Sequence, residues 1–186
     1  GHLHVVEWLH TNRTECCTIR AMDSAARKGH LPVVEWLHVN CSEGCTTMAM
    51  DGAAEQGFLN VVEWLHANRL EGCSQGAINK AAGKGHLSVV EWLHANRSED
   101  CRTASIFASE HGHLSIVEWL YANTTQACTS LAIGVAAASG HLSIVKFLHA
   151  NLGQVDYCRL KLTRAADTAA GNGHLPVAEW LRGQLL

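Results

Sequence analysis

The sequence predicts an all-α protein in which short antiparallel helix pairs stack as one repeat solenoid. A Gly-His-Leu motif or a close variant begins seven times, at successive spacings of 28, 28, 28, 27, 28 and 33 residues. A large aromatic residue stands seven positions after each of these glycines. A fixed period of this length is typical of repeat architectures, in which each unit completes its core against its neighbours. The motif glycines are Gly1, Gly29, Gly57, Gly85, Gly112, Gly140 and Gly173.

One helix of each unit is predicted directly after the motif. In residues 88–94, apolar side chains at positions i, i+1, i+3 and i+4 form a wide stripe that has to be buried, and Trp92 belongs to it. Ser88 and Glu91 have the spacing of a capping box. An asparagine ends each of these helices, and asparagine tolerates the left-handed conformation found there. These asparagines are Asn12, Asn40, Asn68, Asn96, Asn123 and Asn151.

The other helix of each unit is shorter and precedes the motif, as in residues 48–56. Gly57 follows where a C-terminal glycine cap belongs. The pair Ala53 and Ala54 allows neighbouring helices to approach closely. Asp51 lies in the first turn, where a negative charge complements the helix dipole, and Asp23 and Asp167 repeat it.

These residues resemble the ankyrin repeat, whose pattern Thr-Pro-Leu-His-x-Ala-Ala-x-x-Gly-His precedes a Val-Val-rich second helix. Residues 48–57 align with it without a gap. Residues 103–112 also align with it and begin with the threonine of the family pattern. The resemblance implies paired helices and a protein-binding scaffold. Most units are shorter than the family's ~33 residues, so short turns are expected where ankyrin repeats carry a β-hairpin finger. Residues 152–158 are expected to form a finger-like excursion, and Asp51 occupies the place of the family's first-helix histidine.

The composition and the uninterrupted spacing of the repeats indicate one domain covering residues 1–186. Apolar residues make up 47% and charged residues 17%, a globular balance, and the net charge of −3 gives no general attraction to nucleic acid or an anionic membrane. No apolar run approaches the ~18 residues of a membrane span. No secretory leader is visible, which favours an intracellular, cytoplasmic protein. The chain opens inside a repeat, so we expect it to be a segment of a longer array.

Eight cysteines raise the question of disulfides and metal binding. Six recur in phase, and equivalent positions of stacked helical repeats lie ~10 Å apart, beyond disulfide range. They are therefore expected to be small buried residues of an intracellular protein. Cys16 and Cys41 are out of phase, and Cys41 with Cys45 lacks a second ligand pair, so no metal site is predicted. The in-phase cysteines are Cys17, Cys45, Cys73, Cys101, Cys128 and Cys158.

Most of the thirteen histidines also follow the repeat period, either after the motif glycine or on the following helix. Periodicity explains them as structural residues, with the first series implied by the resemblance to tie the inter-helix turns. His111 and His113 give a weak signal for an opportunistic metal. No phosphate-binding loop, nucleophile elbow or His-Glu-x-x-His motif is present. The sequence therefore predicts no catalytic residues, no cofactor and no enzymatic activity.

Function is expected at positions that vary between units, on the first helix and the turn after it. Ankyrin repeats bind partners with the equivalent concave face, so the resemblance implies a protein partner, with acidic residues beside an apolar anchor. Variation on a solvated surface, and a role as a structural spacer or an end-to-end assembly segment, stay open as alternatives. The expected partner-binding residues are Arg20, Ser24, Arg27, Lys28, Met48, Glu55, Gln56, Lys80, Lys84, Thr103, Phe107, Glu110, His111, Leu131, Val135 and Arg164.

Overall fold

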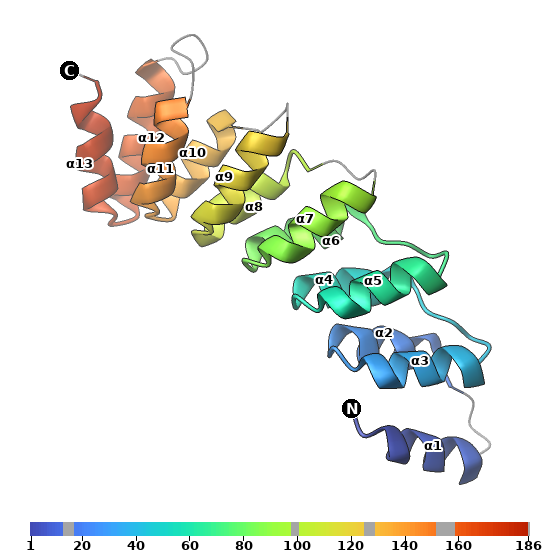
Figure 1. Ribbon diagram of the computed structural model, residues 1–186. Coiled ribbons are helices and arrows are strands. Elements are labelled where there is room, and N and C mark those ends of the chain that lie inside the picture. The colour runs from blue at the N-terminus through green and yellow to red at the C-terminus, as the bar shows by residue number, and fades with distance from the viewer. Residues whose placement is uncertain (13–16, 98–100, 125–128, 152–158, 186) are drawn as a thin grey trace. The chain divides into compact units, whose positions relative to one another are not determined.

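The computed structural model describes residues 1–12, 17–97, 101–124, 129–151 and 159–185. Within these ranges all regular secondary structure is α-helical, in thirteen helices of which α1 precedes a series of antiparallel pairs (Figure 1). The predicted all-α repeat fold is thus confirmed. The expected excursion at residues 152–158 lies outside the described residues, as do Cys16, Cys128 and Cys158.

The chain forms two compact units, and the predicted single domain stays a prediction. The first unit comprises residues 1–81 and 88–99, and the second comprises residues 82–87 and 100–186. Helices of the first unit are α1 (Leu3–Asn12), α2 (Ile19–Arg27), α3 (Leu31–Asn40), α4 (Thr47–Glu55), α5 (Leu59–Asn68), and most of α6 (Gln75–Gly83) and α7 (Leu87–Asn96). Those of the second are α8 (Ala104–His111), α9 (Leu114–Asn123), α10 (Thr129–Ala138), α11 (Leu142–Asn151), α12 (Arg159–Gly171) and α13 (Leu175–Gly183).

The core of each unit combines alanines of the first helices with branched residues of the second. In α4 and α5, Ala53, Ala54, Val61 and Val62 are fully buried and Leu65 is 1% exposed. The small alanines bring the helix axes close, and the valines fill the layer behind them. Burial of this apolar surface, repeated from pair to pair, stabilises the stack.

The tryptophans lie at the edge of this core, which differs from the sequence prediction. Trp64 and Trp92 are half-buried, whereas the valines of the same helices are buried. Each indole meets the edge of a histidine ring from the preceding helix pair. His38 lies 5.3 Å from Trp64 between ring centroids, and His66 lies 5.1 Å from Trp92. The aromatic residue and the second-helix histidine therefore form one inter-repeat contact.

The helix-ending asparagines also differ from the prediction. No described residue other than glycine has a positive φ, so these asparagines do not adopt the left-handed conformation. Instead the side-chain amide donates to the carbonyl of the aromatic residue four positions earlier, as from Asn68 Nδ2 to Trp64 O at 2.8 Å. Asn40 and Asn123 do the same to Trp36 and Trp119 at 2.8 Å. The side chain thus competes with solvent for a carbonyl in the last helical turn.

The predicted capping boxes are absent from α5 and α9. Asn60 and Ser115 hold the place of Ser88 in these two helices. Both helices begin two residues earlier than such caps would place them, after the cap residues Phe58 and His113, and neither has a side-chain cap hydrogen bond. The carbonyl of Phe58 accepts from Val61 N and Val62 N at 3.1 Å. The Gly-His-Leu motif therefore starts the helix through its backbone.

The motif glycine turns the chain between the two helices of a pair. Gly112 ends α8 with φ +83°, a left-handed conformation that favours glycine. His113, directly after it, has its Nε2 3.1 Å from Gly83 O, and His141 Nε2 lies 3.0 Å from Glu110 O. Because a carbonyl only accepts, both Nε2 atoms are the donors. The structural role expected for these histidines is confirmed at these two positions.

Candidate functional site

Four of the expected partner-binding residues line one hollow in the first unit. Arg20, Ser24 and Arg27 come from the exposed side of α2, and Met48 comes from the first turn of α4. The hollow has a volume of about 410 Å³ and is also lined by Asp23. All four expected residues are exposed, with Met48 at 55%. We call the exposed side of the first helices and their following turns the first-helix face.

A glycine in α4 gives Arg27 its position on this face. A Cβ placed on Gly52 would lie 3.0 Å from the Cβ and the Nε of Arg27. The Arg27 side chain therefore runs across α4 where no side chain obstructs it. Its guanidinium adds positive charge to the hollow, beside the apolar surface of Met48.

The carboxylate of Asp23, in this hollow, is hydrogen-bonded to Thr46. Asp23 Oδ1 accepts from Thr46 N and Asp23 Oδ2 accepts from Thr46 Oγ1, both at 2.8 Å. Thr46 Oγ1 in turn accepts from Met48 N at 3.1 Å. Because the carboxylate faces the start of α4, Arg20 and Arg27 dominate the charge that this hollow presents to solvent.

Further along the first-helix face, two expected residues bind each other. Lys80 Nζ lies 3.4 Å from Glu55 Oε2, a partly exposed pair linking α6 to α4. A pair this exposed contributes little stability, so a partner could displace it without a large penalty. Lys28 at the end of α2 and Gln56 at the end of α4 are also exposed.

The second unit presents a different chemistry on its first helices. Phe107 on α8 is 38% exposed, Leu131 on the neighbouring α10 is 57% exposed, and Val135 is half-buried. His111 Nδ1 lies 3.0 Å from Phe107 O and donates to it. The other expected residues of this unit are all exposed: Lys84, Thr103, Glu110 and Arg164.

A second hollow, of about 460 Å³, lies at the turn between α5 and α6 and was not predicted. Asn68, Arg69, Leu70 and Glu71 line it, and Leu70 is fully exposed. Arg69 and Glu71 form a two-pronged ion pair, with Arg69 Nε to Glu71 Oε2 at 3.2 Å and a closer contact between Arg69 Nη2 and Glu71 Oε1. The hydrogen bond from Arg69 lowers the pKa of Glu71 to about 2.

The same arginine reaches back to the preceding turn. Arg69 Nη1 donates to His38 Nδ1 at 3.3 Å, and Glu71 Oε1 accepts from Cys45 N at 3.5 Å. The Cys45 thiol lies beside this pair, and its burial, with the nearby Glu71 charge, raises its pKa to about 11. Recurrence of Arg-x-Glu at 69–71 and 97–99 was the sequence signal for this inter-repeat tie.

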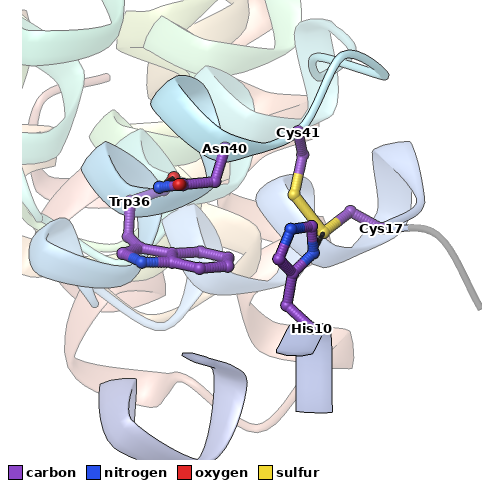
Figure 2. Close-up of a disulfide and its surroundings, with 5 residues drawn as sticks. All are labelled: His10, Cys17, Trp36, Asn40 and Cys41. Carbon is purple, nitrogen blue, oxygen red and sulfur yellow. Dashed lines mark hydrogen bonds between the residues drawn. A yellow bond between two sulfur atoms is a disulfide. The ribbon is translucent and has the colours of Figure 1, made fainter. Parts of the chain in front are cut away.

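One pair of cysteines departs from the expected free, reduced state. Cys17 and Cys41 form a disulfide, with Cα atoms 6.0 Å apart (Figure 2). The spacing argument fails here because Cys41 is out of phase and ends α3 beside the start of the preceding α2, whereas in-phase cysteines are a full repeat apart. Cys45 is a buried thiol, as expected, whereas Cys73 and Cys101 are half-buried.

Comparison with known families identifies the class of protein. A family profile described as ankyrin repeats (3 copies) matches residues 50–130, and one described as ankyrin repeats (many copies) matches residues 22–66 and 133–182. The chain therefore belongs to the ankyrin repeat family, as its motifs suggested. A comparison with curated proteins finds no match.

Family membership gives the general role of the fold. Ankyrin repeats are generally protein–protein interaction modules and are typically not enzymes. Among the described helices, none is both long enough and apolar enough to cross a membrane. Recognition is thus to be sought on the surfaces that the repeats display.

Proposed function

We propose that this chain is a protein-interaction module whose partner binds on the first-helix face. The hollow formed by Arg20, Ser24, Arg27 and Met48 is the observation that supports this most directly. It joins residues from two consecutive repeats, and these residues vary along the chain while the core beneath them does not. Ankyrin repeats in general separate an invariant scaffold from variable contact positions.

The chemistry of the first-helix face defines the partner. Two guanidinium groups beside an exposed methionine suit an acidic side chain next to an apolar one. In the second unit, Phe107 and Leu131 offer apolar anchors of the kind that dominate interface energetics. The proposed partner is an intracellular protein with acidic and apolar residues close together.

The test compares the proteins captured by the unmodified chain with those captured by single-substitution variants. The substitutions lie either on the first-helix face or on a second helix. Arg27→Glu reverses a charge on the first-helix face, whereas Lys146→Glu reverses an exposed charge on the second helix α11. We expect a protein retained by the unmodified chain and by Lys146→Glu to be lost with Arg27→Glu, and to bind more weakly to Phe107→Ala. Equal capture by all four proteins, with helicity unchanged by circular dichroism, would place binding elsewhere.

A spacer or end-to-end assembly role is the second proposal, supported by the exposed apolar side of α1. Val5, Trp8 and Leu9 are 44%, 59% and 42% exposed, and no residue of α1 is buried. Sedimentation velocity over a wide concentration range tests it. Growth in mass that Trp8→Ser abolishes would support assembly through α1, whereas a constant monomer mass would exclude it.

A further inference from the structure

Three metal-ligand atoms converge where α1, the start of α2 and the end of α3 meet. His10 Nδ1 and the sulfurs of Cys17 and Cys41 all lie within 4.8 Å of one another, with His10 Nδ1 3.9 Å from Cys17 Sγ. His10 is exposed and both cysteines are half-buried, so solvent reaches the cluster. Figure 2 shows the imidazole between the Trp36 indole and the two sulfurs.

Comparison with the next repeat shows what is special about this cluster. His10, Cys17 and Cys41 each correspond to a residue 28 positions later, namely His38, Cys45 and Arg69. There the Arg69 guanidinium contacts the imidazole of His38 and the thiol of Cys45. The turn of the next repeat therefore places a cationic group between a histidine and a cysteine.

In the first repeat a thiol replaces that cation. Cys41 takes the position that Arg69 and Arg97 hold in later repeats. A third soft donor now faces the imidazole and the first thiol, and no side-chain cation stands at this position. Two thiols and an imidazole are the donor types that zinc selects.

The histidine is oriented independently of any metal. The His10 ring meets the Trp36 ring edge-on, with centroids 5.1 Å apart and planes at 84°. His38 meets Trp64 at 5.3 Å and 85°, and His66 meets Trp92 at 5.1 Å and 85°. Since this contact recurs in the next two repeats, the fold fixes the imidazole so that Nδ1 faces Cys17.

We propose that reduced Cys17 and Cys41, with His10, form a three-ligand zinc site, and that the Cys17–Cys41 disulfide is its oxidised, metal-free form. Zinc prefers tetrahedral coordination, so water from the exposed side completes the site. Zn–S distances of ~2.3 Å separate the two sulfurs by about 3.8 Å, which a disulfide does not allow. The two states therefore exclude each other.

The interconversion needs a thiol reductant. A dithiol of the thioredoxin class supplies two electrons and two protons, which convert the disulfide to two thiols and the reductant to its own disulfide. Zn²⁺ then replaces the two thiol protons, which pass to solvent. In a reducing compartment this cluster is a metal site, and in an oxidising one it is a covalent link between the first repeats.

The experiment uses Co²⁺ as a spectroscopic probe, followed by Zn²⁺ competition. All proteins carry Cys16→Ser, so that the neighbouring thiol cannot bind the probe, and are reduced with a phosphine that is then removed. The control is Cys41→Arg, which recreates with Glu43 the Arg-x-Glu motif of the next two repeats. It should fold normally because that motif ties the same turn one repeat later.

We expect the reduced protein to bind one Co²⁺ with thiolate-to-metal charge-transfer bands and tetrahedral ligand-field bands, both removed by Zn²⁺. Zinc should protect Cys17 and Cys41, but not Cys101, from alkylation in peptide mapping. The Cys41→Arg, His10→Gln and oxidised proteins should bind at least tenfold more weakly, and the oxidised protein should show no charge-transfer bands. Absence of these bands in the reduced protein, or equal binding by Cys41→Arg, would overturn the proposal and leave the cysteines a disulfide pair only.

Discussion

Asp51 in α4 holds the start of α6 through two hydrogen bonds to Ser74. Its Oδ1 accepts from Ser74 N at 2.8 Å, and its Oδ2 accepts from Ser74 Oγ at 2.5 Å. The Asp23–Thr46 contact is the same arrangement one repeat earlier. Ankyrin repeats have a histidine at this first-helix position, so a carboxylate here performs an inter-repeat role with different chemistry.

Replacement of Asp51 by alanine should lower the free energy of unfolding by about 2 kcal/mol. Asp51 is only 8% exposed, and its loss leaves the Ser74 amide and hydroxyl without a charged acceptor. Asp167→Ala is the control, because Asp167 is exposed and its contact with Arg182 is 3.4 Å long. Urea unfolding followed by circular dichroism should show a change below about 0.5 kcal/mol for the control. Equal losses for both variants would mean that the Asp51 contact has no special strength.

Two glycine-to-alanine changes in the second unit should have opposite effects. Gly112 has φ +83°, and a Cβ on it would lie 2.7 Å from His141 Cε1. Gly112→Ala should therefore destabilise the protein by about 1–2 kcal/mol or more. Gly134 lies inside α10 with nothing within 4 Å of a Cβ, so Gly134→Ala should stabilise it by about 0.5–1 kcal/mol. Thermal melts would contradict this account if both variants shifted the midpoint in the same direction.

The repeat fold could be predicted because its signals are periodic and local. The motif glycine, the alanine pair and the Val-Val-x-x-Leu stripe each depend on one helix pair, and all occupy the expected places. The helix starts were displaced by two residues because the backbone of Phe58 or His113 caps the helix, which no side-chain motif indicates. The roles predicted for the helix-ending asparagines and for the tryptophans were wrong, because each of these side chains can make several alternative contacts that compete with one another.

The site was harder to predict, because its residues come into contact only when neighbouring repeats pack on one another. The hollow at Arg20, Arg27 and Met48 joins helices of two repeats, and the choice of varying positions located most of its lining but missed Asp23. The Cys17–Cys41 contact joins non-equivalent positions of neighbouring repeats. Alignment of Cys41 with Arg69 and Arg97 was the available signal for it.

Cys45 should react slowly with iodoacetamide in the folded, reduced, metal-free protein. Burial and the adjacent Glu71 raise its pKa to about 11, so the thiolate that attacks the reagent is scarce at neutral pH. Cys41, half-buried, serves as the internal reference. Peptide mapping at short reaction times should show modification of Cys41 well before Cys45. Unfolding in urea should remove the difference, and its persistence there would show that the fold is not its cause.

The Arg69–Glu71 pair should make stability depend on pH in a defined window. Arg69 lowers the pKa of Glu71 from 4.5 to about 2, so the folded state binds this proton less readily than the unfolded state. The stabilisation is fully present above pH 4.5 and is lost as the pH falls toward 2. Because both side chains are about a quarter exposed, we expect about 1 kcal/mol from the pair after solvent screening.

Glu71→Gln should therefore be less stable than the unmodified protein above pH 4.5, and the difference should vanish near pH 2. Denaturant unfolding at several pH values measures this, and a difference that stayed constant across the window would mean that the glutamine acts through packing rather than through the ion pair.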